Sequence, residues 1–201
     1  MGQRLIITVK NNGEDLAKIY YHWSAYTVSA LWEASKVVRC IYNHKDETEK
    51  ELKLRLIRFI EENGGGIRGD DYEFEYIRNM YPNETFKEDE YSRSNGLIAL
   101  SEKGMSELQD WSEGDIEIFI DEERISNTVF GWYSDYEEYH DEVKSWGEDY
   151  EEYLVKFENI PDIGYDLGDI AIEDIDNIIT ALEAAKEHIV KYGNEIYELV
   201  E

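Results

Sequence analysis

The first part of the chain alternates between strand-like and helix-like patterns of apolar residues. Residues 4–10 (RLIITVK) are rich in β-branched side chains, and residues 11–13 (NNG) have the composition of a tight turn. Residues 16–23 (LAKIYYHW) supply the returning strand of a predicted β-hairpin. Apolar residues then recur at helical spacing over 28–41, which predicts an amphipathic helix.

A second helix is predicted over residues 45–63, where the apolar residues form one stripe. Three glycines at 64–66 follow it, and glycine is the usual residue after a helix end. Residues 67–95 are polar and rich in Tyr, with one short helix predicted near 72–80 and closed by Pro82.

Short elements dominate the middle of the chain. Residues 96–101 (GLIALS) predict a strand, and residues 102–111 predict a short helix. In residues 115–121 (DIEIFID), Ile alternates with acidic or aromatic residues, which is the period of a half-buried strand. Residues 122–124 predict a turn, and residues 125–134 the returning strand of a second hairpin.

The longest periodic pattern lies between residues 136 and 160. Successive apolar residues there are separated by three and four positions in alternation, which is a heptad pattern. It predicts one amphipathic helix over about 134–158, and this helix contains the pentapeptide DYEEY twice. A turn-rich loop over 158–170 and a C-terminal helix from about 172 to 192 follow. The apolar stripe consists of Tyr136, Tyr139, Val143, Trp146, Tyr150, Tyr153, Phe157 and Ile160.

The order of these elements predicts the fold class. A hairpin, helices, further strands and further helices indicate an α+β protein with a mostly antiparallel sheet of about five strands. Amphipathic helices pack on this sheet, and the C-terminal part is helical and acidic. The length of 201 residues suits a single domain over 1–201.

Charge divides this domain into two unequal parts. The formal net charge is −27, far more than solubility requires. Residues 1–100 contain 14 Lys and Arg and 17 Asp and Glu, which gives a net charge of −3. Residues 101–201 contain 6 Lys and Arg and 30 Asp and Glu, which gives a net charge of −24. A halophilic surface would spread its acids evenly, so the imbalance favours a localised electrostatic role over general solvation.

The predicted helix over 134–158 concentrates this charge. Positions four apart on a helix are about 6 Å apart, and nucleic acid also places phosphates several ångströms apart. An acidic row with roughly nucleic-acid spacing would attract a protein groove built of Lys and Arg. The alternative is a solvent-facing acidic helix with no partner. The candidate partner-binding residues are Asp135, Glu137, Glu138, Asp141, Glu142, Glu148, Asp149, Glu151 and Glu152.

This acidic composition resembles that of the DNA-mimic inhibitors of phages and mobile elements, which include anti-restriction and anti-CRISPR proteins. The resemblance rests on composition and on residues 107–176, not on a motif, so no functional residue is transferred by position. It implies a non-enzymatic inhibitor that occupies the basic nucleic-acid groove of a bacterial defence nuclease, such as a CRISPR effector or a restriction enzyme. Without a basic patch, the chain itself is not expected to bind nucleic acid.

Catalytic residues, metal sites and cofactors are not expected. Cys40 is the single cysteine, which excludes an internal disulfide and a Cys-based zinc site. The loop that contains Asp162, Asp166 and Asp169 does not have EF-hand spacing. The chain start lacks a signal-peptide pattern and no stretch is apolar enough to span a bilayer, which predicts a cytoplasmic location and no membrane partner. The resemblance implies that this cytoplasm is that of a bacterial host cell.

Two other functions remain open. His22, Ser24 and Tyr26 form a polar cluster where a strand meets a helix, a place where a small molecule or nucleotide could bind or a hydrolase could act. The alternative, purely structural interpretation of this cluster is a helix start beside packed aromatic rings. Alternatively, the chain is an acidic adaptor that dimerises through the stripe between residues 136 and 160.

Overall fold

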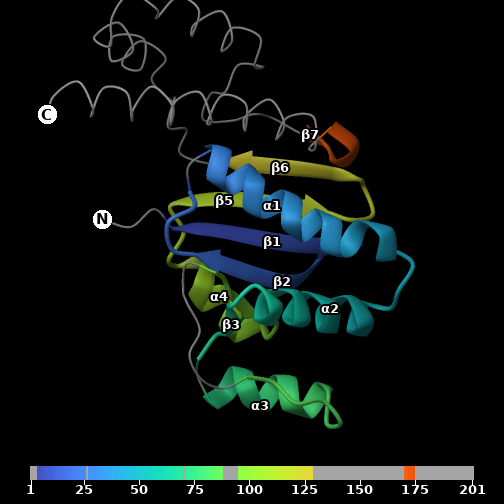
Figure 1. Cartoon of the computed structure of the whole chain (residues 1–201), viewed down its shortest axis with the longest axis vertical. Helices are drawn as coiled ribbons and strands as arrows, with labels where there is room; N and C mark the ends of the chain where they lie inside the picture. Colours follow the sequence, from blue (N-terminus) through green and yellow to red (C-terminus); the bar gives the residue numbers. More distant parts are fainter. Residues whose placement is uncertain (1–3, 26, 70, 88–94, 129–169, 175–201) are drawn as a thin grey trace, which may run out of the picture.

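The computed structural model describes residues 4–25, 27–69, 71–87, 95–128 and 170–174 (Figure 1). In chain order the elements are β1 (Leu5–Asn11), β2 (Glu14–Tyr21), α1 (Thr27–Ile41), the 3-10 helix η1 (Tyr42–His44), α2 (Glu49–Glu62), β3 (Gly66–Ile67), α3 (Asp71–Met80), β4 (Leu97–Ala99), α4 (Glu102–Gln109), β5 (Gly114–Phe119), β6 (Arg124–Thr128), β7 (Ile170–Ala171) and the 3-10 helix η2 (Ile172–Asp174).

The strands of the described residues form one open sheet in the order β3-β4-β2-β1-β5-β6-β7. The α+β content is confirmed, but the prediction of a mostly antiparallel sheet of about five strands needs correction. Seven strands take part, and two of the pairs, β1 with β5 and β3 with β4, are parallel. The parallel partners are far apart in the sequence, and local alternation gives no information about such pairing. The two-residue strands β3 and β7 are too short to show a period.

The β1–β2 hairpin is confirmed, and its turn has a specific backbone cause. Asn12 and Gly13 have φ angles of 51° and 79°, the left-handed values that a two-residue hairpin turn requires. Asn tolerates this conformation better than most residues, and Gly adopts it without a steric cost. The pairing joins Leu5 to Tyr21 at one end and Asn11 to Glu14 at the other.

Helix α2 begins later than predicted because Thr48 caps it. The Thr48 side chain accepts a hydrogen bond from the Glu51 backbone NH, and the Glu51 carboxylate accepts one from the Thr48 backbone NH at 2.8 Å. This reciprocal pair satisfies two NH groups that a helix start leaves free. At the other end, Gly64 has a φ of 83°, which confirms the role of glycine after this helix.

The helices cover both faces of the sheet. Helices α1 and α2 cross the front of the sheet in Figure 1, and their apolar residues pack with Leu5, Ile7 and Val9 of β1. Ile6 points to the opposite face, because neighbouring residues of a strand alternate, and there it packs with Leu108 of α4. The sheet therefore separates a large core from a smaller one.

Other predicted elements agree with the structure to within a few residues. Helices α3 and α4 and the β5–β6 hairpin lie where the patterns placed them. η2 begins where the C-terminal helix was expected, but residues 175–192 of that prediction lie outside the described residues, as do residues 129–134 of the predicted strand. The predicted helix over 134–158 and its apolar stripe lie outside them as well.

A buried carboxylate fixes the start of α4. Glu73 of α3 has no exposed surface, and it accepts hydrogen bonds from the Leu100 NH at 2.6 Å and the Ser101 NH at 3.0 Å. The Ser101 hydroxyl also donates to Glu73 and in turn accepts from the Gly104 NH at 3.0 Å. The Glu73 carboxylate oxygens therefore lie where the free NH groups of a helix start are concentrated.

Gly104 is the residue that allows this approach. A Cβ atom at position 104 would lie far inside van der Waals contact with the Glu73 carboxylate and also 3.0 Å from the Ser101 hydroxyl oxygen. Alanine normally stabilises a helix by about 1 kcal/mol relative to glycine, but here the clash opposes that gain.

We expect Gly104→Ala to lower the free energy of unfolding by about 1–3 kcal/mol, because Glu73 or α4 must move to admit the methyl group. Urea unfolding followed by circular dichroism measures the change. In a Glu73→Ala background, where the clash is absent, Gly104→Ala should be neutral or stabilising. Equal destabilisation in both backgrounds would show that Glu73 is not the cause.

Candidate functional site

The nine predicted partner-binding acids cannot be located in this structure. Residues 129–169, which include Asp135 to Glu152, lie outside the described residues. The prediction that they form an outward row is therefore neither confirmed nor contradicted. β6 ends at Thr128, so the described part of the chain leads directly up to this segment.

The corner around His22 is described in part. The Tyr20 hydroxyl and His22 Nδ1 are 2.5 Å apart, and the His22 ring meets the exposed Trp23 ring edge-on at a centroid distance of 4.7 Å. Ser24 is buried, and among the described residues no hydrogen bond joins it to His22. The ring contacts fit the packing interpretation. Tyr26 lies outside the described residues, so a pocket bounded by all three residues stays a prediction.

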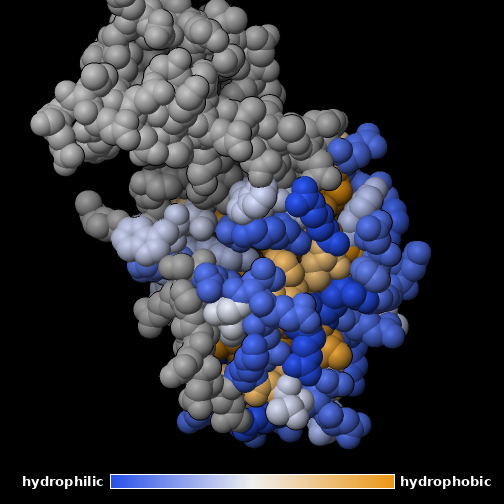
Figure 2. Space-filling model, in the orientation of Figure 1, coloured by the Kyte–Doolittle hydropathy of each residue, from blue (hydrophilic) through white to orange (hydrophobic). Residues whose placement is uncertain are grey.

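A cavity that the sequence did not predict lies between α1 and α2. Its volume is about 630 Å³, and its lining comes from the end of α1, from His44 in η1 and from the side of α2 that faces α1. Figure 2 shows apolar surface between the polar side chains in this region. Half-buried Cys40, Leu54 and Phe59 supply apolar lining, and charged residues surround them.

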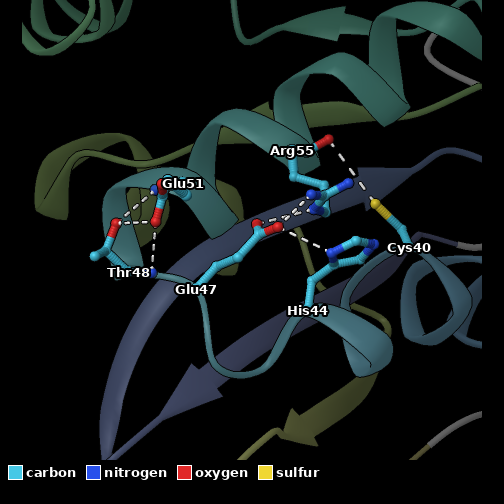
Figure 3. Close-up of polar contacts among 6 residues, drawn as sticks. All are labelled: Cys40, His44, Glu47, Thr48, Glu51 and Arg55. Carbon is cyan, nitrogen blue, oxygen red and sulfur yellow. Dashed lines mark hydrogen bonds and ion pairs between the residues drawn. The ribbon is translucent and has the colours of Figure 1, made fainter.

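One end of the cavity contains a charged cluster centred on Glu47 (Figure 3). Glu47 accepts hydrogen bonds from Nε of Arg55 at 3.1 Å, from Nη2 of Arg55 at 2.5 Å and from the His44 ring at 2.9 Å. The hydrogen bond from Arg55, with a further contribution from His44, holds the pKa of Glu47 below its ordinary value. Glu47 is therefore ionised at neutral pH and orients Arg55.

Glu51 lies in the same lining but points to the helix cap. Its carboxylate accepts from the Thr48 backbone NH at 2.8 Å and from the Thr48 hydroxyl at 2.7 Å. These hydrogen bonds lower the pKa of Glu51. The carboxylate serves the start of α2 and is not free to act on a ligand as an acid.

Cys40 lies above the His44 ring in Figure 3, but its surroundings do not activate it. Its Sγ donates weakly to the Arg55 carbonyl oxygen at 3.9 Å, and burial raises the pKa of the thiol to about 11. A protonated thiol is a poor nucleophile, so Cys40 acts here as a small apolar residue. This agrees with its expected place on a helix that packs on the core.

The sequence contained a local signal for this cluster. Glu47 follows His44 by three positions and precedes Arg55 by eight, so all three residues lie near the junction of the two predicted helices. Sequence spacing does not pair His44 with another histidine. Its partner is Glu47, three residues further along the chain.

Comparison with protein-family models, with curated proteins and with solved structures finds no match for this chain. Across the described ranges, no group of three or more His, Cys, Asp or Glu residues is arranged to hold a metal ion. None of the helices in the described part of the chain has the length and apolar character to cross a membrane.

We expect Arg55→Gln to raise the pKa of Glu47 toward its ordinary value, because the main hydrogen bonds to the carboxylate are lost. A carbon-detected NMR titration of the Glu47 carboxyl measures this. Because the pKa of Glu47 is lower in the folded than in the unfolded protein, its contacts with Arg55 and His44 stabilise the fold at pH values above the unfolded-state pKa. This stabilisation is lost as the pH falls through the folded-state pKa. Arg58→Gln is the matched control, since Arg58 does not contact Glu47, and an equal shift in both variants would contradict the assignment.

Proposed function

We propose that this protein is a non-enzymatic inhibitor that mimics nucleic acid and occupies the basic groove of a bacterial defence nuclease of the CRISPR-effector or restriction type. The observation that supports it is the charge imbalance, −24 in residues 101–201 against −3 in residues 1–100. The site of action would be the cytoplasm of a bacterial host cell. The proposed contact residues are the nine acids from Asp135 to Glu152.

The segment that contains these acids has few cations of its own. Residues 129–169 include 13 Asp and Glu but only two Lys, at positions 144 and 156. Helices with acidic outer faces usually include Lys four positions away, which offsets the repulsion. Repulsion among uncompensated acidic side chains destabilises a compact folded state, and binding to a cationic groove would offset that repulsion.

The described residues use many of their cations internally. They contain 15 Lys and Arg and 24 Asp and Glu. Among the pairs, Arg58 contacts both Glu61 and Glu84, and Lys10 bridges Asp15 and Glu117 across three strands. Cations in such pairs are less available to neutralise the acids of residues 129–169. Ion pairs involve Arg4, Lys10, Lys18, Lys36, Lys45, Arg55, Arg58, Arg68, Lys103 and Arg124.

Electrostatic attraction would dominate the encounter with such a partner. A surface of one sign raises the association rate with a groove of the opposite sign, and added salt reduces that rate. The inhibitor would compete directly with the substrate nucleic acid, since both would neutralise the same Lys and Arg residues. Inhibition should therefore weaken as salt rises.

Charge reversal at four of the acids tests the proposal. Asp135, Glu138, Asp149 and Glu152 are replaced by Lys together, and DNA cleavage is measured with a panel of restriction enzymes and CRISPR effector nucleases. We expect the unmodified protein to inhibit at least one of them at physiological salt, and the variant to be about a hundredfold weaker or more, because interfacial charge pairs become repulsive.

The matched control reverses four exposed acids of the described residues, Glu14, Asp46, Glu75 and Asp110. It changes the net charge by the same amount and should retain most of the inhibition. Equal loss in both variants would show that only overall charge matters. Full inhibition by the first variant, with circular dichroism showing an intact fold in both, would rule out the proposed contact residues.

A further inference from the structure

We propose that the cavity between α1 and α2 is a binding site for a small amphipathic organic acid, with its carboxylate at Arg55 and its apolar body on Leu54 and Phe59. This site is separate from the proposed contact with a nuclease and does not depend on it. All of its residues are described by the structure.

The size and lining of the cavity suit a small ligand. Its volume of about 630 Å³ falls within the range of about 300–1,000 Å³ that is typical of ligand pockets. Leu54 and Phe59 are only partly buried, although both pack against the main core. An apolar ligand would cover the surface that these side chains leave open, which is the burial that favours binding.

Arg55 supplies an anion-binding group that is already oriented. Two of its three guanidinium nitrogens, Nε and Nη2, donate to Glu47, and Figure 3 shows the third pointing away from that carboxylate. Among the described residues, no acceptor takes a hydrogen bond from Nη1. Glu47 fixes the plane of the Arg55 guanidinium group. Binding of a ligand carboxylate would therefore cost little further side-chain entropy at Arg55.

The other charges of the lining do not cancel this attraction. Glu47 is paired with Arg55 and hydrogen-bonded to His44, and Glu51 is directed to Thr48. Arg39, in the last turn of α1, also lines the cavity. Glu51 and Arg55 lie toward one end of the α2 lining, and Glu62 lies at the other end. An anionic head group is therefore favoured at the Arg55 end, away from Glu62.

The same charges favour a monoanion over a phosphate dianion. Arg58 contributes little to an anion, because Glu61 and Glu84 already pair with its guanidinium at 2.7 and 2.6 Å. The one Arg55 nitrogen that Glu47 does not engage can donate to one carboxylate oxygen, and a second ligand charge would be repelled by ionised Glu47. The ligand class is therefore a carboxylic acid with an aliphatic or aromatic body.

The single cysteine provides a local probe of occupancy. Cys40 lines the cavity, so a ligand there should shield it from iodoacetamide, which is small and uncharged. Alkylation of the full-length protein is followed by mass spectrometry at about pH 9, because the raised pKa makes the reaction slow at neutral pH. The probe ligand is 4-phenylbutyrate, compared with its uncharged amide and with inorganic phosphate.

We expect 4-phenylbutyrate to slow the alkylation of Cys40 severalfold and in a saturable manner. The amide should bind about tenfold more weakly, because it lacks the charge-assisted hydrogen bond, and phosphate should give no protection. Arg55→Gln should weaken the protection by 4-phenylbutyrate about tenfold, and Leu54→Glu should remove it. Lys50→Gln, which changes an exposed cation of α2 outside the cavity lining, should have no effect.

Three results would overturn the proposal. They are an absence of saturable protection up to about 10 mM, equal protection by acid and amide, or undiminished protection in both Arg55→Gln and Leu54→Glu. Isothermal titration calorimetry with the same ligands gives an independent measure of binding. Circular dichroism of each variant separates loss of the site from loss of the fold.

Discussion

The pairing of β1 along both of its edges is the constraint on which the rest of the described structure depends. β2 pairs with it in the antiparallel direction and β5 in the parallel direction. Leu5, Ile6 and Ile7 are fully buried as a result, although their side chains alternate between the two faces. Each face therefore needs its own cover, which α1 and α2 supply on one side and α4 on the other.

Local patterns in the sequence were sufficient to predict the elements that are stabilised by contacts between neighbouring residues. The turn at Asn12 and Gly13 follows from residue type, and the stripe of α2 marks the core-facing side of that helix. The parallel pairing of β1 with β5 and the two-residue strands could not be predicted, since they depend on contacts between distant segments. The cavity was missed for the same reason: Glu47 and Arg55 are near in sequence, but the space beside them exists only because α1 and α2 pack together.

Buried carboxylates of the described residues serve the fold, whereas those of residues 129–169 are proposed to serve a partner. Glu73 and Glu61 are buried, and each is surrounded by backbone NH groups or cations that replace its lost hydration. The acids of residues 129–169 greatly outnumber the cations of the same segment. The number of acidic residues alone therefore says little about what each carboxylate does. A structural carboxylate is surrounded by NH groups or cations of the protein, whereas a carboxylate without such neighbours is available to a partner.

The late arrival of β5 has a consequence for synthesis on the ribosome. Leu5 pairs with Gly114, which follows it by 109 positions. The N-terminal hairpin therefore leaves the ribosome with both outer edges open, since β4, the other partner of β2, also lies far along the chain. An open apolar edge can pair with another nascent chain. Translation speed between these two points determines how long that edge is exposed. Codon choice upstream of residue 114 thus bears on the yield of folded protein, even though it leaves every contact of the finished molecule unchanged.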